Sequence, residues 1–586
     1  MATDFLARTF AARQVRRLAS TLEGEGAALV GTASGAALQT LLDQGLGVPV
    51  TGIAPGEDAA DAIELAASRA ARTGVDVILP PFEVTLSRPV RVNRLRGTPG
   101  LSRIDVSACA MGAFPLSQFC LVNQHWSMAH DEATADICAY RGFEIASTPE
   151  TPHSLLGLAN VRHALIEDVT FTARRHLGAN GKPVIVDALL DFYAAVHGAK
   201  VRRCTFRQLT GAYGATRVSA GGGGCIWIRN LSSNGTLAAN VTENVSVSDC
   251  DFAHYTSDEC IAIYGVRGQT RKCGVTANRI ASLEAADLGL PAAESIYRAT
   301  LIGVFPLDDG SGANLGNTAA VHGNTLADNA ITDKSTLYST IRIGNTADAA
   351  RRCENNRSER NKVAFRYWSD TANGHLASWT AAGASGSSPA TACIPIRCIE
   401  GTPGLAYTGA LSGNASLDDE IVTTPDSATV FCGFVGWQFV RGGRVRGSVS
   451  TGASSCQLVE GGQWEVSLRG FTNCTHVTGV SVRINAATIS AHCAFHVDSS
   501  AGGTYTLSAS RLHGGSMAYL AAGAGANTAI NVQGCSGTLG AYDALTCTRA
   551  DGTIRAGGNH MTGPSAAHAG PGTFKTAANS WGAVDD

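Results

Sequence analysis

A hydrophobic pattern with a step of three followed by a step of two recurs along this chain. The stretches VRRCTF, VSDCDF and VTANRI begin at Val201, Val247 and Val275, and each runs from an apolar residue through a small or polar-tolerant one to a large apolar one. A single β-strand alternates with a period of two and cannot produce this pattern. Two short strands joined by a one-residue corner can, with Val247 inward on the first strand and Cys250 and Phe252 inward on the second. The pattern therefore predicts a chain that turns corners and coils.

The corner motif returns at intervals that fit a solenoid. Val201, Val247 and Val275 are 46 and 28 residues apart, and the later stretches that begin at Leu507, Val532 and Ile554 step by 25 and 22. Sequence periods of about 20–50 residues are typical of solenoids, so one bare coil should take roughly 22–25 residues. The longer intervals predict inserted loops, such as those expected at 220–224 and 281–316.

Residues 55–92 predict a helix that is followed by strands. Acidic residues near Pro55 suit the N-terminus of a helix, where the helix dipole is positive, and Gly74 suits its C-terminus. The stretches VDVILP, FEVTL and VRV then read as strands. A helix ahead of a run of strands predicts a cap over the exposed strand edges at the open end of a stack. The expected buried stripe of the helix is Ile63, Ala66, Ala67 and Ala70.

These patterns divide the chain into five parts. Short helices are expected at 4–22 and 36–44. We therefore predict an N-terminal helical segment at 1–45, the capping helix and first coils at 46–160, and central coils with inserted loops at 161–370. An irregular linker is expected at 371–425. Residues 426–586 form a β-rich C-terminal region, which is either a second, narrower stack or a β structure formed between chains.

Composition supports an all-β protein and excludes some partners. The chain has 586 residues with 67 Gly and only 16% charged residues. This composition, rich in small side chains, favours β structure and indicates few long helices. The net charge is −3 and the pI is near 6.6, which argues against a nucleic-acid partner. The sequence shows no signal peptide and no apolar run of about 18 residues, so we expect synthesis in a cytoplasm and no membrane insertion.

The 17 cysteines are scattered, with neither a CxxC pair nor the ligand spacing of a zinc site. Cys204, Cys250 and Cys535 stand at inward corner positions, where cysteine acts as a small apolar residue. Disulfide formation after release from the cell is the alternative for some of them. Because there is neither an Asp-rich calcium repeat nor a carboxylate cage, we expect no essential metal and no cofactor.

The order of these parts resembles the tailspike proteins of bacteriophages, specifically those with a pectate-lyase-like right-handed parallel β-helix. The likeness covers residues 25–370 well and the remainder loosely. It departs in the loop before the helix, which reads TGIAPGEDAAD where the family commonly has GDG…DD. The matching residues, besides the coil motifs, are Asp58, Asp61, Ile63, Ala66, Ala67, Gly74, Val75, Val77, Leu79, Pro80 and Pro81.

The resemblance implies a homotrimer whose N-terminal segment docks on other tail or baseplate proteins of the virion. It also implies that the side of the β-helix, or a groove between chains, binds a bacterial surface polysaccharide such as a capsule, an exopolysaccharide or an O-antigen. Many members of the family cut or deacetylate that polysaccharide. The expected location is the virion tail, acting at the host cell surface.

The best local cluster of catalytic residue types lies at 248–265, SDCDFAHYTSDECIAIYG. Its segment from Ser257 to Ile263 resembles the GDDCIAI motif of polygalacturonase-type β-helix hydrolases, which implies acid and water-activating roles for Asp258 and Glu259. Asp249 and Asp251 complete the acidic cluster. The segment departs from the motif because its second acid is Glu, and the NTD stretch that the motif has one coil earlier is missing.

Strand alternation predicts which way these carboxylates face. Since Phe252 faces inward, Asp251 should face outward. Since Ile261 and Ile263 face inward, Asp258 should also face outward. The two aspartates would then line one outer surface of a single coil. Glu259 has the inward parity and needs a corner to be exposed, because a lone buried carboxylate is costly.

Residues that contact a sugar are expected beside these acids. Trp227 lies between two inward isoleucines, which favours an outward ring that stacks on sugar, and Trp368 is a second candidate. His254, Tyr255 and Arg271 are further candidates; with Lys272 they would also serve a polysaccharide lyase.

The sequence thus predicts a tailspike that binds a bacterial surface glycan and depolymerises it by hydrolysis of glycosidic bonds. Two alternatives remain open: a polysaccharide lyase, and a spike of the same fold that binds without cleaving. A secreted plant-polymer enzyme is disfavoured by the missing signal peptide and the N-terminal helix.

Overall fold

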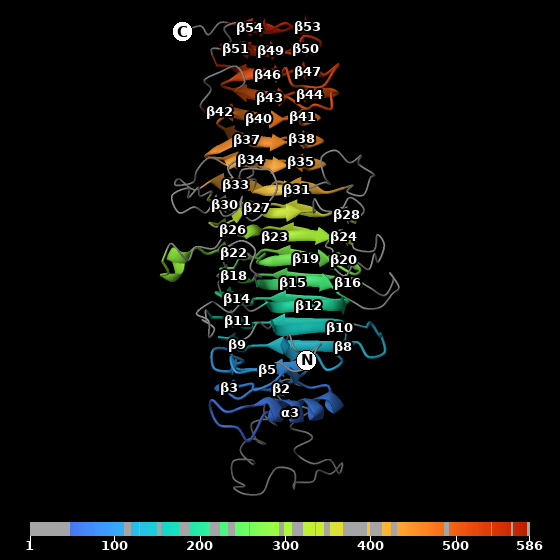
Figure 1. The fold of residues 1–586 in the computed structure, drawn as a ribbon, viewed down its shortest axis with the longest axis vertical. Coiled ribbons are helices and arrows are strands. Elements are labelled where there is room, and N and C mark those ends of the chain that lie inside the picture. The colour runs from blue at the N-terminus through green and yellow to red at the C-terminus, as the bar shows by residue number, and fades with distance from the viewer. Residues whose placement is uncertain are drawn as a thin grey trace, which may run out of the picture.

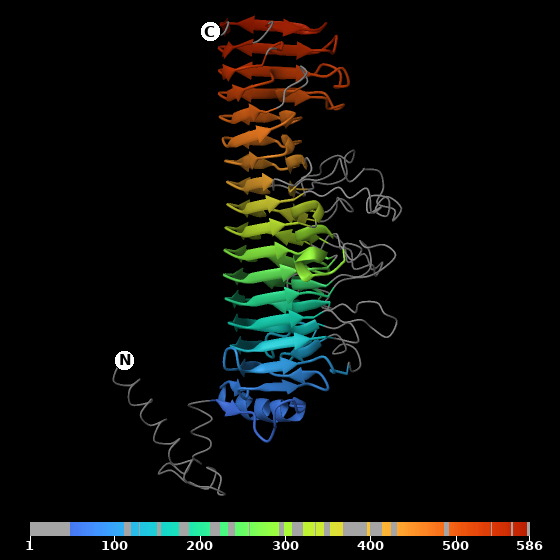
Figure 2. The same cartoon turned by 90° about the vertical axis from the view of Figure 1, so that its left-hand side faces the viewer.

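The structure is a long column of stacked coils (Figures 1 and 2). We describe it from a computed structural model, in which the predicted parallel β-helix is confirmed. Among the described residues no helix is long and apolar enough to cross a membrane. The residues that the structure describes are 47–110, 119–127, 129–148, 154–174, 187–210, 223–231, 241–256, 258–291, 298–306, 320–334, 336–344, 352–366, 395–398, 413–423, 430–485, 492–540, 542–563 and 567–582.

The expected capping helix is present as α3 (Ala60–Thr73) at the lower end of the column in Figure 1. It begins a few residues later than the acidic segment suggested and ends at Gly74, whose φ of 69° is the left-handed conformation that glycine adopts most easily. Its predicted apolar stripe is buried against the first coils. The expected helices at 4–22 and 36–44 lie outside the described residues.

Three ladders of parallel strands run the length of the column. The first ladder consists of β4 (Val90–Arg91), β7 (Phe119–Val122), β10 (Ser154–Glu167), β12 (Ala188–Val196), β15 (Gly224–Asn230), β19 (Ile261–Gly265), β23 (Arg298–Pro306), β27 (Thr336–Ile343), β31 (Ile396–Cys398), β34 (Val430–Val435), β37 (Val449–Ser454), β40 (Arg469–Thr472), β43 (Cys493–Val497), β46 (Ser516–Leu520), β49 (Leu545–Cys547) and β52 (His568–Ala569).

The second ladder shares the long strand β10 with the first, since the two halves of β10 pair in different ladders. Its other strands are β1 (Val48–Pro49), β2 (Val77–Ile78), β5 (Arg94–Arg96), β8 (Asp136–Arg141), β13 (Ala199–Arg202), β17 (Val245–Ser248), β21 (Gly274–Thr276), β25 (Thr325–Ala327), β29 (Arg357–Glu359), β32 (Ala415–Leu417), β35 (Phe439–Arg441), β38 (Leu458–Glu460), β41 (His476–Thr478), β44 (Thr504–Ser508), β47 (Ala529–Gln533), β50 (Thr553–Gly557) and β53 (Thr573–Ala577).

The third ladder closes the coil. It consists of β3 (Glu83–Thr85), β6 (Arg103–Asp105), β9 (Glu144–Ser147), β11 (Thr170–Ala173), β14 (Thr205–Gln208), β18 (Asp251–His254), β22 (Arg279–Ser282), β26 (Ala330–Asp333), β30 (Lys362–Phe365), β33 (Glu420–Thr423), β36 (Arg444–Arg446), β39 (Gln463–Val466), β42 (Ser481–Ile484), β45 (Arg511–His513), β48 (Ser536–Thr538), β51 (His560–Thr562) and β54 (Ser580–Gly582).

Two smaller features decorate the central coils. A short fourth ladder lies between the first and second in β16 (Val241–Glu243), β20 (Gln269–Arg271), β24 (Ala320–His322) and β28 (Arg352–Glu354). A 3₁₀ helix, η3 (Ala285–Leu288), falls within the loop expected at 281–316.

The predicted corner is confirmed between the second and third ladders. In the central coil, β17 ends at Ser248, Asp249 has a left-handed φ of 55°, and β18 begins at Asp251. Val247, Cys250 and Phe252 are all buried, as the pattern required. Arg203 and Ala277 take the same backbone conformation in the neighbouring coils. A single left-handed residue therefore turns the chain between two flat faces.

The C-terminal region differs from one of the expectations for it. The described residues from β34 onward continue the same three ladders (upper, orange and red part of Figure 2) rather than forming a separate narrower stack. Within the predicted linker, the described strands β31, β32 and β33 likewise extend the ladders. Association between chains through this region stays a prediction.

Identical side chains stack on one another inside the coil. Phe171, Phe206 and Phe252 form a continuous pile with ring centroids 4.9 and 4.8 Å apart and nearly parallel planes. Cys204, Cys250 and Cys535 are buried, as expected, and the described cysteines form no disulfide. Because the spacing of parallel strands is about 4.8 Å, Phe206 lies over Phe171, Phe252 lies over Phe206, and Cys250 lies beside Cys204 in the same way.

In the coils that follow Cys250, buried asparagines occupy the equivalent corner position and form a row of hydrogen bonds. The backbone N–H of Cys250 donates to Asn278 Oδ1 at 3.0 Å, and Asn278 and Asn329 are bonded in the same way to the next coil at 3.1 Å each. Asn361 donates to Oδ1 of Asp419 at 2.8 Å. The row thus ends on a carboxyl group where the preceding members are neutral amides.

Asp419 should therefore make stability depend on pH. Burial raises the pKa of Asp419 to about 6, although hydrogen bonds from Ser416, Ser358 and Asn361 oppose the rise. The folded protein binds this proton more tightly than the unfolded chain does. The free energy of unfolding therefore falls as pH rises from about 4 to about 6, by at most about 3 kcal/mol from this group.

We predict that Asp419→Asn raises the melting temperature at pH 7 and leaves it nearly unchanged at pH 3.5, because the amide needs no ionisation. The control is Asp418→Asn, at an exposed neighbouring position, which should change stability by less than about 0.5 kcal/mol. Equal melting temperatures of Asp419→Asn and the unmodified protein at pH 7 would contradict the prediction.

Candidate functional site

The register of the first ladder brings together polar and aromatic side chains from three consecutive coils. Asp191 on β12 pairs in register with Trp227 on β15, and Trp227 pairs with Ala262 on β19. Arg229 is likewise in register with Tyr264. The Trp227 side chain is half-buried while its neighbours Ile226 and Ile228 are buried, so its predicted outward position is confirmed. These residues define one patch on the outer face of the first ladder.

Arg229 fixes the geometry of this patch. Its Nε and Nη2 donate to the two carboxylate oxygens of the buried Asp191 at 3.1 and 2.5 Å. Its guanidinium carbon lies 4.8 Å from the ring centroid of Tyr193 and 4.7 Å from that of Trp227. A cation held by a bidentate ion pair and two aromatic faces leaves the Trp227 ring little freedom to turn.

The Trp227 ring can occupy its position because residue 224 is a glycine. A Cβ atom at Gly224 would lie 2.2 Å from the indole Nε1, so no other residue fits beneath the ring. This explains one glycine of the run at 220–224, which the sequence had suggested only as a loop.

Asp258 and Glu259 lie in the turn that enters β19, at the edge of the same patch. The Glu259 backbone N–H donates to Asp258 Oδ1 at 3.0 Å, and the Tyr264 hydroxyl donates to Glu259 Oε2 at 2.7 Å. Both carboxyl side chains are half-buried. Strand alternation had left the direction of the Glu259 side chain open. These hydrogen bonds show that it turns toward the outer face of the first ladder.

The two carboxyl groups act on each other. Burial raises the pKa of Asp258 well above its ordinary value, and a hydrogen bond with the Glu259 carboxyl group raises it further. Burial likewise raises the pKa of the Tyr264 hydroxyl, so it remains a hydrogen-bond donor. Asp258 therefore keeps its proton to a higher pH than an ordinary aspartic acid does, and the Tyr264 hydroxyl holds the neighbouring Glu259 side chain in place.

A third carboxyl group, Asp187, precedes β12 in the coil that also carries Asp191. Burial raises the pKa of Asp187, the charge of Arg229 opposes this, and Asp191 adds to it. Arg229 acts on Asp258 in the same direction. One cation thus influences carboxyl groups from two different coils. The patch contains a carboxyl group with a raised pKa, a second carboxyl group that accepts from a tyrosine, and an aromatic platform.

The structure separates the other predicted acids from this patch. Asp249 is the left-handed corner residue, and Asp251 lies on the outer face of the third ladder, where it pairs with Arg279 at 2.5 Å. Asp251 and Arg279 line a surface groove of about 510 Å³ there. Asp251 does face outward, as predicted, but it lies on a different side of the coil from Asp258, because the chain turns between β18 and β19.

The predicted sugar-contacting residues other than Trp227 have different surroundings. His254 and Tyr255 are buried in the interior, so neither is accessible to a substrate. Arg271 pairs with Glu243 at 2.7 Å on the short fourth ladder. Trp368 lies outside the described residues.

Sequence reasoning missed Asp187, Asp191, Arg229 and Tyr264. The alternation in GCIWIRN did place Arg229 on the same face as Trp227, so its direction could have been found. The partnership of Arg229 with Asp191 spans 38 residues of sequence and needed the register of the coils.

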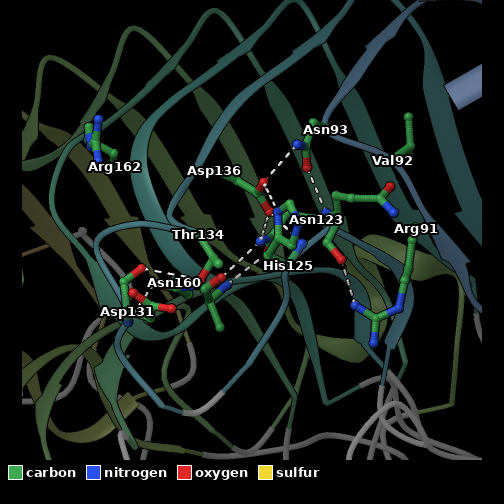
Figure 3. A network of polar contacts seen from close by, with 12 residues as sticks. Arg91, Val92, Asn93, Asn123, His125, Asp131, Thr134, Asp136, Asn160 and Arg162 are labelled. Atoms are coloured by element: carbon green, nitrogen blue, oxygen red, sulfur yellow. Dashed lines mark hydrogen bonds and ion pairs between the residues drawn. The ribbon is translucent and has the colours of Figure 1, made fainter. Parts of the chain in front are cut away.

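A second polar cluster lies beside the capping helix (Figure 3). Four donors converge on the nearly buried carboxylate of Asp136: the side-chain amides of Asn93 and Asn123 at 2.8 and 2.6 Å, and the backbone N–H and ring Nδ1 of His125 at 2.6 and 2.8 Å. His125 also lines a cavity of about 500 Å³ between α3 and the first coils. This network ties together the segments around β4, β7 and β8 in the first coils.

Comparisons with known proteins find distant structural similarities. No protein-family profile and no curated protein matches the sequence. Similar solved structures include the tailspike of E. coli bacteriophage HK620 in complex with a pentasaccharide, at 11% identity and a TM-score of 0.38 over 81% of this chain and 82% of that one.

Two other structures are similar over much of their length. One is the Streptococcus pneumoniae surface adhesin PfbA, at 11% identity and a TM-score of 0.32 over 90% of this chain and 97% of that one. The other is DFA-IIIase from Arthrobacter chlorophenolicus in complex with GF2, at 12% identity and a TM-score of 0.30 over 74% of this chain and 91% of that one. The class that the fold defines is the parallel β-helix protein.

We predict that Asp136→Asn destabilises the first coils. The amide would turn N–H groups toward donors, at a cost of roughly 1–3 kcal/mol for each buried donor left without an acceptor. Urea denaturation measures the effect. Asp131→Asn is the control, since Asp131 is exposed and keeps the oxygen that accepts from Ala133. Equal denaturation midpoints for the two variants would show that the network does not stabilise the fold.

Proposed function

We propose that this protein is a bacteriophage tailspike that binds a bacterial surface polysaccharide and hydrolyses its glycosidic bonds during adsorption. The observation that carries the proposal is the hydrogen-bonded Asp258–Glu259 pair beside the rigid Trp227 platform on the outer face of the coil. Glycoside hydrolysis needs a protonated carboxyl group for the leaving oxygen and a second carboxylate on the other side of the bond.

Each residue has a role in this proposal. A sugar ring stacks on the face of Trp227, and Asp258 donates its proton to the glycosidic oxygen as the bond breaks. The hydrogen bond between the two carboxyl groups helps Asp258 to keep that proton, and Tyr264 positions Glu259 by donating to its Oε2 at 2.7 Å. Since Asp258 and Glu259 touch each other, they are closer than the roughly 5–9.5 Å that separates acid and base in glycosidases, so they act as one proton-donating unit. Asp187 is the candidate for the opposing carboxylate that accepts a proton from the attacking water.

The remaining parts of the proposal follow from the resemblance of the sequence to tailspikes. Residues 1–45 attach the protein to other tail proteins, three copies associate, and the protein acts from the virion tail at the cell surface. Size-exclusion chromatography with light scattering tests the trimer, and a chain lacking residues 1–45 should no longer assemble into virions.

We predict that Asp258→Asn and Glu259→Gln each lower the rate of depolymerisation by about 10²–10⁴-fold, the usual contribution of general acid catalysis. The measurement is the release of new reducing ends from purified capsule or O-antigen of a host strain. Asp251→Asn is the matched control and should retain activity, since Asp251 lies on the third ladder. An equal loss in Asp251→Asn would place the chemistry in the groove of the third ladder instead.

The same assay separates the alternatives. A rise in the absorbance of unsaturated sugars without dependence on Asp258 would favour a lyase. Retained binding with no change in glycan size would favour a non-enzymatic spike.

The pH profile gives an independent test. Because the pKa of Asp258 is raised, the acid stays protonated to a higher pH than an ordinary aspartate. We predict that activity persists to a higher pH than an ordinary aspartic acid would allow and falls as pH rises through the raised pKa. An alkaline limb that is unchanged in the residual activity of Asp258→Asn would contradict the assignment of the acid.

A further inference from the structure

Three side chains that commonly bind metals meet inside the central coils. Cys225 is the second residue of β15 and lies in the core, His254 is the last residue of β18, and Cys260 directly precedes β19. All three are fully buried, and their ligand atoms lie within 4.8 Å of one another. The two cysteines come from adjacent coils, where the Cys225 backbone N–H donates to the Cys260 carbonyl oxygen at 2.8 Å.

The orientation of His254 suits metal binding. Its Nε2 lies 2.8 Å from the backbone carbonyl oxygen of Asp258, which can only accept, so Nε2 carries the proton. The other nitrogen, Nδ1, then presents its lone pair toward the thiols and lies 3.7 Å from Cys225 Sγ. A metal-binding histidine typically donates its second ring N–H to a backbone carbonyl or a carboxylate in this way.

We propose that Cys225, His254 and Cys260 bind one Zn²⁺ ion per chain. The two thiols release their protons to solvent on binding, and two thiolates with a neutral imidazole cancel the charge of the ion. Charge balance favours Zn²⁺ over Cu⁺, which would leave a net negative charge in an apolar core. The fourth position of the tetrahedron falls to an oxygen ligand such as water.

Within the part of the chain that the structure describes, no other cysteine pair forms such a group with a histidine. Cys204 and Cys250 also occupy adjacent coils, but their thiols donate to the backbone carbonyls of Arg202 and Ser248 at 3.3 and 3.1 Å. Among the described residues, neither thiol belongs to a group of three or more metal-binding side chains. This pair is therefore a matched control with the same residue type, burial and position across neighbouring coils.

The site does not depend on the proposed hydrolysis, although it lies directly beneath the residues that we assign to it. His254 holds the carbonyl of Asp258, and Cys260 follows Glu259 in sequence. An ion at this place would fix the turn that carries both carboxyl groups, so its loss should be visible in stability even with no substrate present.

The experiment uses the purified full-length chain. We expect metal analysis to find about one zinc ion per chain, which falls to nearly none in Cys225→Ser/Cys260→Ser and stays unchanged in Cys204→Ser/Cys250→Ser. Since the first variant could fold poorly, the unmodified protein is also stripped with a chelator and titrated with Co²⁺. We expect an intense thiolate-to-cobalt charge-transfer band and, with Zn²⁺, recovery of the melting temperature that the chelator lowered.

Three results would overturn the proposal. They are zinc retained by Cys225→Ser/Cys260→Ser, Co²⁺ binding without a thiolate charge-transfer band, and an intact mass that shows a Cys225–Cys260 disulfide in the protein as isolated. A zinc-bound protein that lacks hydrolytic activity would leave this proposal standing and reject only the proposed function.

Discussion

The constraint on which this structure depends is the in-register stacking of parallel strands. Each coil offers its backbone N–H and C=O groups to the coils on either side, so a shift of one residue would move every inward side chain of a strand to the surface. The continuous pile of Phe171, Phe206 and Phe252 shows the register directly, because each ring lies on its equivalent. The left-handed residues at the corners keep the pile aligned, since they allow the chain to turn without adding a second loop residue.

The same register creates the candidate site. No short motif contains Asp191, Trp227 and Tyr264, yet the pairing of β12, β15 and β19 places them on one outer face. Consecutive coils lie about 4.8 Å apart, so groups from two or three coils come within reach of one another and of one or two sugar units. A solenoid can therefore assemble acid, carboxylate and aromatic platform from distant segments without a deep cleft.

Sequence reasoning succeeded where the decisive information was local. The step of three and two contained the corner, and the structure confirms the inward positions of Val247, Cys250 and Phe252. It failed for the grouping of Asp251 with Asp258, because equal parity defines a common face only within one straight strand. A turn intervenes between β18 and β19, so both residues face outward from different sides. The Arg229–Asp191 ion pair was beyond reach for another reason: it needs the length of an inserted loop between two coils, which no local pattern fixes.

Polar groups inside the coil are governed by the same stacking, and this links the interior to the surface chemistry. At the corner between the third and first ladders, Gln208, His254 and Ser282 occupy equivalent positions in successive coils. Gln208 Nε2 donates to the Gly224 carbonyl and His254 Nε2 to the Asp258 carbonyl, so each ties down the turn that enters the first ladder. A buried polar group must find a partner, and here the partner is the backbone beside Trp227 in one coil and beside Glu259 in the next. The buried polar side chains that find their hydrogen-bond partners in this way therefore hold the turns from which the outer site is built.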